Sequence, residues 1–167
     1  MTDANYAPPT AKVDDEPRPA AGVLRQILAV FAAFTIDVVG TETLNGVLGY
    51  VYFAVVGGEG GAQNLLARYA DALSSYDNPW GIAQFIIGSG MSVIGGYLCV
   101  RIAWRREWRA IGWLCVVHTA YSLFRGSPVD FYWWESNAIT LGSVVIGAAL
   151  QSALRRRALQ RAASAGT

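Results

Sequence analysis

The sequence has few charged residues and little of the chemistry on which soluble enzymes rely. Only 15% of its 167 residues are charged and 53% are apolar, whereas an ordinary soluble domain carries about a quarter charged residues. It has 1 histidine and no His-Glu-x-x-His sequence, which excludes the usual zinc sites of hydrolases. It also lacks a long basic tract with interleaved aromatic residues, so we expect no nucleic-acid partner. We therefore predict a non-enzymatic chain without a metal or other cofactor.

Cysteine chemistry is equally sparse. Cys99 and Cys115 both lie inside apolar segments and lack the C-x-x-C spacing of redox and zinc sites. We predict that both are buried thiols without a chemical role.

Long apolar stretches dominate the rest of the sequence. A transmembrane helix needs roughly 20 apolar residues, and the candidate spans are 21–57, 81–102, 109–124 and 131–154. The first is too short for two spans, so we expect one long helix that is tilted or projects outward. The third is short enough to require local thinning of the bilayer. These stretches predict an all-α fold, a four-helix transmembrane bundle over 21–154.

The segments outside the spans are polar. Residues 1–20 are rich in proline and acidic side chains and cannot bury enough apolar surface to fold, so we predict a disordered leader. Residues 59–80 are amphipathic, which indicates a short helix on the periplasmic surface that ends at Asn78-Pro79. Residues 155–167 begin with consecutive arginines and predict a basic cytoplasmic tail.

Basic residues lie mainly on one side of the predicted spans. Loops rich in Lys and Arg stay cytoplasmic, so we predict that both termini are cytoplasmic and that 58–80 and 125–131 are outside. Only Arg68 and Arg125 fall on the outer side. The other basic residues, all on the inner side, are Lys12, Arg18, Arg25, Arg101, Arg105, Arg106, Arg109, Arg155, Arg156, Arg157 and Arg161.

Small residues recur at four-residue spacing in the second and fourth spans. Such spacing lets helix backbones approach closely where lipid removes the hydrophobic drive for association. It predicts packing within one bundle or, alternatively, a contact with a second copy or another membrane protein. The residues concerned are Gly88, Ser92, Gly95, Gly96, Gly142 and Gly147.

Ionisable and polar groups inside the spans are the strongest indication of function, because a charge in the bilayer centre costs several kcal/mol. Depths follow from the boundary arginines at about 1.5 Å of helix rise per residue. One polar layer is then expected to hold Asp37, Ser89, His118 and Ser143. A second layer, further out, is expected to hold Glu42, Asn45, Gln84 and Asn137.

Two functions fit these groups. In the first, the groups hydrogen-bond to one another and fix helix packing, in a protein that acts through packing or partner contacts within the lipid bilayer. In the second, they form the proton or cation site of a small transporter or channel subunit. Asp37 would then bind the proton or cation, His118 would relay it, and Glu42 would be the alternate carboxylate. A Ser89–His118 catalytic dyad is disfavoured, because Ile87 stands where the G-x-S-G sequence of rhomboid-type proteases has its first glycine.

Two short stretches resemble bacterial membrane proteins. Residues 5–14, NYAPPTAKVD, resemble the N-P-Y-A-P-P-x-A-x-V-x-D opening of many proteobacterial inner-membrane proteins, although Ala4-Asn5 replaces the usual Asn-Pro. Residues 95–103, GGYLCVRIA, are similar to a G-G-Y-x-x-x-R-I-A segment of small bacterial multi-pass proteins of unknown function. Those proteins also carry an Asp in a Gly-rich first helix, which Asp37 matches. The resemblance implies a bacterial inner-membrane location and no particular activity.

Overall fold

The computed structural model describes residues 19–56, 62–74, 77–103, 107–125, 129 and 131–165. Its five helices are α1 (Pro19–Val56), α2 (Ala62–Ser74), α3 (Pro79–Ala103), α4 (Glu107–Phe124) and α5 (Phe131–Ala165). No strand occurs among these residues, so the predicted all-α class is confirmed for the described part of the chain. The predicted leader, 1–20, lies outside it except for Pro19 and Ala20, which begin α1.

Two helices are longer than one membrane crossing requires. α1 has 38 residues and α5 has 35, so both exceed about 50 Å, against roughly 30 Å of hydrocarbon in a bilayer. α1 is one continuous helix over the first apolar stretch. α5 does not end at Leu154 but continues through the segment predicted as a separate tail, because residues 155–165 are rich in the strong helix formers Arg, Ala and Leu.

The start of α3 is fixed by a side-chain cap. The Asn78 Oδ1 atom accepts hydrogen bonds from the backbone N–H groups of Trp80 (2.9 Å) and Gly81 (3.0 Å). Pro79 follows at the first helical position, where its missing N–H costs nothing and its fixed φ suits the helix. The Asn78 Nδ2 atom also donates to the carbonyl oxygen of Ala72 at 2.8 Å, which ties the end of α2 to the start of α3.

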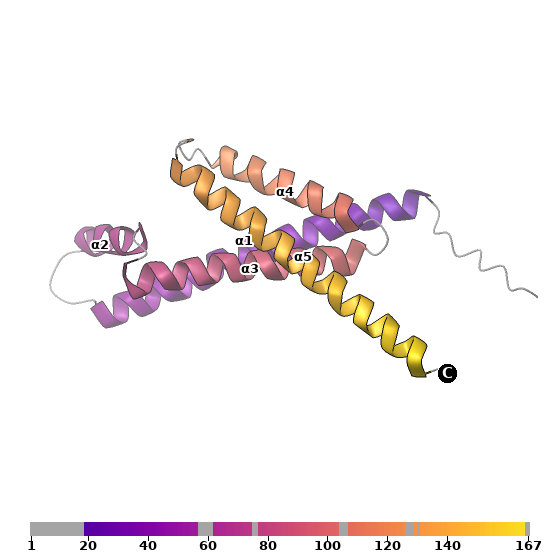
Figure 1. Cartoon of the computed structure of the whole chain (residues 1–167). Helices are drawn as coiled ribbons and strands as arrows, with labels where there is room; N and C mark the ends of the chain where they lie inside the picture. The colour runs from indigo at the N-terminus through magenta and orange to yellow at the C-terminus, as the bar shows by residue number, and fades with distance from the viewer. Residues whose placement is uncertain are drawn as a thin grey trace, which may run out of the picture.

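α3 lies at the centre of the packing and contacts the four other helices. α1 and α3 run side by side, while α4 and α5 form a second pair that packs across them (Figure 1). α5 crosses α3 obliquely, so its C-terminal half leaves the other helices (Figure 1). The short helix α2 lies near the ends of α1 and α3 that are remote from this crossing.

Two adjacent glycines allow α3 to approach a different helix on each side. A Cβ atom built on Gly95 would lie 3.2 Å from the carbonyl oxygen of Ala33 on α1. One built on Gly96 would collide with the carbonyl oxygen of Val144 on α5. Gly147 plays the same role on α5, because a Cβ atom built on it would collide with the carbonyl oxygen of Val93 on α3. Because glycine has no side chain beyond a hydrogen atom, the backbones of α3 and α5 touch directly.

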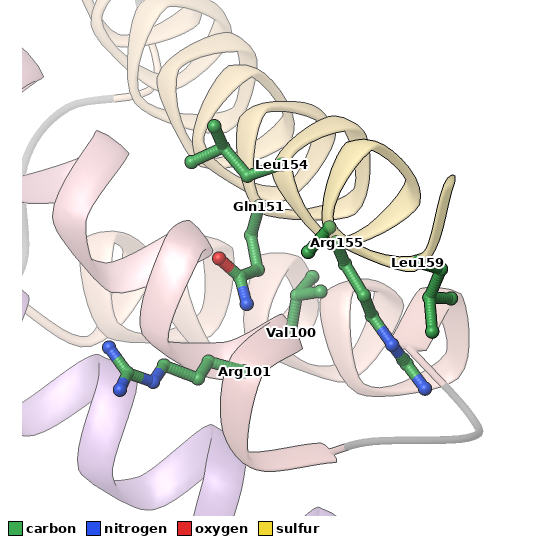
Figure 2. Close-up of a pocket in the computed structure, with 7 residues that line it drawn as sticks. Val100, Arg101, Gln151, Leu154, Arg155 and Leu159 are labelled. Atoms are coloured by element: carbon green, nitrogen blue, oxygen red, sulfur yellow. The ribbon is translucent and has the colours of Figure 1, made fainter. Parts of the chain in front are cut away.

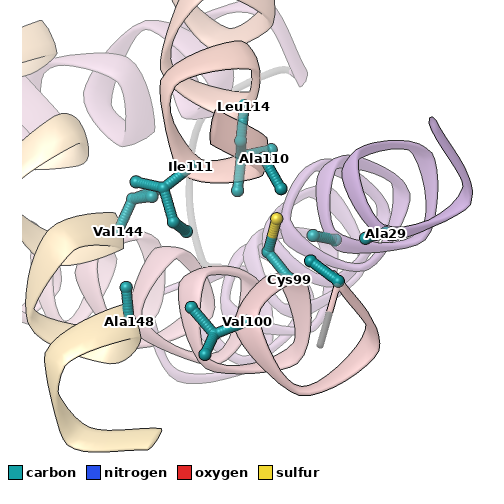
Figure 3. Close-up of a cluster of buried hydrophobic side chains, with 10 residues drawn as sticks. Ala29, Cys99, Val100, Ala110, Ile111, Leu114, Val144 and Ala148 are labelled. Carbon is teal, nitrogen blue, oxygen red and sulfur yellow. The ribbon is translucent and has the colours of Figure 1, made fainter. Parts of the chain in front are cut away.

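Small side chains fill the interior, and large apolar ones point outward. The buried cluster where α1, α3, α4 and α5 meet contains Ala29, Ala33, Cys99, Val100, Ala103, Ala110, Ile111, Leu114, Val144 and Ala148 (Figure 3). Phe31, Val39, Ile86, Trp113 and Ile146 are by contrast exposed. Soluble proteins rarely expose apolar surface on this scale, whereas membrane bundles bury small residues and turn large ones toward lipid.

Three helices are long and apolar enough to cross a membrane. They comprise residues Gly22–Val56 of α1, Pro79–Ala103 of α3 and Trp133–Ser164 of α5. The fourth predicted span, 109–124, corresponds to α4, which does not reach the same apolarity. Its 18 residues include Glu107, Arg109 and His118. Length and composition therefore identify three of the four predicted spans.

Two of the predicted packing glycines do not face another helix among the described residues. A Cβ atom on Gly88 or on Gly142 would meet no atom within 4 Å. Four-residue spacing places small residues on one face of a helix but does not say which face meets a neighbour. Ser92, Gly95, Gly96 and Gly147 are the predicted positions that are buried.

The Gly96 contact yields a matched pair of substitutions. We expect Gly96→Ala to lower the free energy of unfolding by about 1–3 kcal/mol, the usual cost of overpacking, because the Val144 backbone cannot move aside as a flexible side chain would. Gly88→Ala makes the same chemical change in the same helix but meets open space, so it should be neutral or slightly stabilising. Thermal unfolding in detergent measures both, and equal midpoints for the two variants would contradict the assignment.

Candidate functional site

The candidate site is a polar cluster around Asp37, where α1, α3 and α4 meet. Ala29, Ala33 and Asp37 follow one another at four-residue intervals and are all buried, so they form one inward stripe of α1. Asp37 is only 3% exposed. A carboxylate at such a position requires polar partners, because burial without them costs several kcal/mol.

Two hydroxyl groups donate hydrogen bonds to one oxygen of Asp37. Ser92 Oγ on α3 lies 3.2 Å from Asp37 Oδ1, and Thr41 Oγ1, one turn further along α1, lies 3.4 Å from the same atom. Gly95 makes room for the carboxylate, since a Cβ there would be 3.3 Å from Asp37 Cβ and 3.6 Å from Oδ2. The glycine that brings α1 close to α3 therefore also accommodates the acidic side chain.

His118 supplies the contact from the third helix. Its Nε2 atom lies 3.1 Å from Asp37 Oδ2, and His118 is 8% exposed. Neither of these two atoms makes a hydrogen bond among the described residues. The imidazole packs edge-on against Phe34, with ring centroids 5.1 Å apart. Asp37 and His118 thus form a close acid–base pair in an environment of low polarity.

The first predicted layer is reproduced only in part. Asp37 and His118 meet, but the serine that reaches Asp37 is Ser92, one turn from Ser89 on α3. Ser89 is half-buried. Ser143 is buried on α5 beside Val144, at the crossing with α3. The serine that contacts Asp37 lies within one turn of the serine expected from the rise per residue. The rotation of α3 about its axis decided which serine faces α1.

Within the part of the chain that the structure describes, the residues of the second predicted layer make no hydrogen bond or ion pair with one another. Glu42 is half exposed and its Oε1 atom pairs with Arg125 Nη1 at 2.7 Å. Asn137 Nδ2 donates to Ser122 Oγ at 3.1 Å and to the Trp133 carbonyl oxygen at 2.9 Å. Gln84 is half-buried on α3. Glu42 is consequently a surface ion-pair partner and not a second buried carboxylate.

Asn45 lies under α2. Its carbonyl oxygen accepts a hydrogen bond from Tyr69 Oη at 3.2 Å, and its buried Oδ1 atom has no hydrogen-bond partner among the described residues. The Tyr69 ring packs against Tyr52 and Phe53 of α1, with centroids 5.0 and 5.4 Å away. Desolvation raises the pKa of the Tyr69 phenol above its usual value of 10.0, so Tyr69 remains a neutral donor.

Two ion pairs were not anticipated from the sequence. Arg125 reaches Glu42, and Arg155 pairs with Glu107, whose other oxygen accepts a hydrogen bond from Ser152 at 3.3 Å. Each pair joins residues far apart in the chain. The opposite charges of these residues were visible in the sequence, but their pairing depends on how the helices align along their axes.

The contacts of the cluster join side chains of three helices. The two hydroxyl groups donate to the carboxylate, and Ser92 does not bind the imidazole that would activate it as a nucleophile. Among the described residues, no group of three or more His, Cys, Asp or Glu side chains is placed to hold a metal ion.

Comparison with known proteins adds no relative. No protein-family model, curated protein or solved structure matches the chain significantly. The similarity of residues 5–14 and 95–103 to small bacterial inner-membrane proteins therefore stays a prediction.

The cluster predicts different outcomes for two substitutions of Asp37. Asp37→Leu would leave Ser92 without its acceptor and remove the carboxylate beside His118, and we expect it to lower the free energy of unfolding by about 1–3 kcal/mol. Asp37→Asn keeps one carbonyl oxygen as an acceptor for Ser92, so it should lower the free energy of unfolding distinctly less than Asp37→Leu does. Unfolding of both variants in detergent provides the comparison. A Leu variant as stable as the parent would show that these contacts do not stabilise the fold.

Proposed function

We propose that the chain is a multi-pass protein of the bacterial inner membrane that acts through helix packing and partner contacts and not through catalysis. The observation that carries this proposal is the set of contacts around Asp37, which ties α1, α3 and α4 together at one buried carboxylate. Polar bonds of this kind associate helices where lipid removes the hydrophobic drive. The resemblance of residues 95–103 supports the bacterial location.

Two sets of polar contacts support α4 as a fourth crossing. At one end of the bundle, Arg25 Nε donates to the Ile102 carbonyl oxygen at 2.7 Å, and Arg155 pairs with Glu107. At the other end, Arg125 pairs with Glu42. The stretch of α1 between Arg25 and Glu42 and the length of α4 each correspond to about 26–27 Å of helix. Both lengths approach the roughly 30 Å of a hydrocarbon core.

Charge placement supports cytoplasmic termini. The end marked by Arg25, Glu107 and Arg155 also carries most of the basic residues, and Lys- and Arg-rich segments stay inside. α2 is then periplasmic, and its Tyr69 lies over the part of α1 that extends beyond Glu42. Trp80 packs against Tyr52 at that same outer end, with ring centroids 5.0 Å apart.

The partners we propose are the lipid bilayer and either a second copy or another membrane protein. Gly88 and Gly142 support this, because a Cβ atom at either position would meet no atom of the described residues within 4 Å. Both expose backbone to which a neighbouring helix can pack closely.

A second candidate function is a proton-coupled transporter or channel subunit. It is favoured by one observation, the 3.1 Å contact of Asp37 Oδ2 with His118 Nε2, since a carboxylate and an imidazole can exchange a proton. Glu42 does not serve as an alternate site within the bundle because Arg125 holds it at the surface. The near-complete burial of Asp37 and His118 fits packing better than transport.

The topology is tested by single cysteines at exposed positions of α2 and α5. Ala67→Cys should react with a membrane-impermeant maleimide in intact cells, and Ala163→Cys only after permeabilisation. The parent, which holds only Cys99 and Cys115, gives the background. Labelling of both positions in intact cells would mean that α4 does not cross. Labelling of Ala163→Cys alone would mean the opposite orientation.

Proton flux separates the two functions. We expect parent protein and Asp37→Asn in proteoliposomes to give the same flux under a pH gradient, because the carboxylate serves packing. A flux that the parent supports and the Asn variant loses would instead establish the transport role. Empty liposomes and the Thr41→Val variant, which keeps the carboxylate, control for leakage.

A further inference from the structure

A groove opens between α3 and α5 at the basic end of the helices, away from Asp37. It is lined by Val100 and Arg101 of α3 and by one face of α5 that includes Gln151, Leu154, Arg155 and Leu159 (Figure 2). The groove follows from the Gly96–Gly147 crossing. The backbones touch there, and the oblique path of α5 separates the two helices beyond that point (Figure 1).

The lining combines two kinds of surface. Val100, Leu154 and Leu159 are apolar, while Arg101 and Gln151 end in groups that donate hydrogen bonds. Gln151 points from α5 toward α3, and the Arg101 and Arg155 side chains extend toward opposite ends of the groove (Figure 2). Leu159 is 63% exposed, in a segment of α5 that is otherwise rich in arginine. A ligand that fits this surface has an apolar part and an acceptor group.

The charge of the groove favours an anion. Arg101 is exposed and has no ion-pair partner among the described residues. The nearby carboxylate of Glu107 is balanced by Arg155 and also accepts a hydrogen bond from Ser152. Arg156, Arg157 and Arg161 continue the positive charge along the exposed part of α5. Guanidinium groups suit phosphate oxygens because their parallel N–H donors match the spacing of those oxygens.

We propose that this groove binds one anionic phospholipid, with its phosphate held by Arg101 and Gln151 and an acyl chain along Leu154. Free phosphate would leave the apolar lining without a role. Lipid at this place would also fill the gap that the oblique crossing leaves. The inference rests on the proposed membrane placement of the basic end and is independent of whether Asp37 moves protons.

The test is lipid binding by the purified full chain in non-ionic detergent. Dioleoyl phosphatidylglycerol is titrated and bound molecules are counted by native mass spectrometry, with dioleoyl phosphatidylcholine as the zwitterionic control and glycerol 3-phosphate as the headgroup without chains. We expect one phosphatidylglycerol to bind more tightly than either control. Arg101→Gln should weaken binding about tenfold, the loss typical of a charge-assisted hydrogen bond.

Two further variants separate the groove from the general basic surface. Arg161→Gln removes the same charge on α5 outside the lining and should leave binding unchanged. Ala158→Trp keeps every charge but fills the groove, of which Ala158 is an exposed lining residue, and should weaken binding as strongly as Arg101→Gln. Circular dichroism checks that each variant is folded. If Ala158→Trp does not fold, the comparison of the two Gln variants decides.

Four results would overturn the proposal. Equal weakening by both Gln variants would indicate diffuse attraction, and full binding by a folded Ala158→Trp would place the lipid elsewhere. Glycerol 3-phosphate binding as tightly as phosphatidylglycerol would mean a phosphate site without a lipid. A dimer that Ala158→Trp abolishes, with no lipid bound to the parent, would mean that a second copy covers the groove. The lipid titration remains interpretable even if the cysteine experiment shows a reversed topology. The proposed topology and the proposed lipid site can therefore fail separately.

Discussion

The close approach of three helix backbones at Gly95 and Gly96 is the constraint on which the rest of the molecule depends. Adjacent residues on a helix point about 100° apart, so two consecutive glycines open two faces of α3 at one level. α1 occupies the first face through Ala33 and Asp37, and α5 occupies the second through Val144 and Gly147. A side chain at either position would push one pair of helices apart. The other contacts between those two helices would then be weakened as well.

The polar cluster follows from that approach. Asp37 sits against Gly95, near enough to α3 for Ser92 to donate to its carboxylate, and α4 closes the site with His118. Small residues let the helices approach closely, and hydroxyl groups donate directional hydrogen bonds to the carboxylate. Packing and hydrogen bonding therefore act at the same place. Because Asp37 would be costly to bury alone, its contacts make partial separation of α1 from α3 or α4 unfavourable.

The oblique crossing of α5 has a further consequence at the basic end. Helices that touch at one point and diverge beyond it leave an opening that their own side chains do not fill. Here the opening lies beside Arg101, and it combines apolar walls with positive charge. The same crossing that brings α3 and α5 into contact therefore creates the surface that we assign to a phospholipid.

The sequence by itself determined the helical class, the apolar stretches of α1, α3 and α5, the small pair Gly95-Gly96 and the shared level of Asp37 and His118. These follow from hydrophobicity and from a constant rise per residue, which do not depend on neighbours. Only the tertiary structure decided that Ser92 and not Ser89 reaches Asp37, that Glu42 pairs with Arg125, and that Gly96 contacts α5 whereas Gly88 faces open space among the described residues. Those outcomes depend on the rotation of each helix about its axis and on the crossing angle. Residues three or four apart share a face, so their spacing alone does not reveal which of them meets a neighbour.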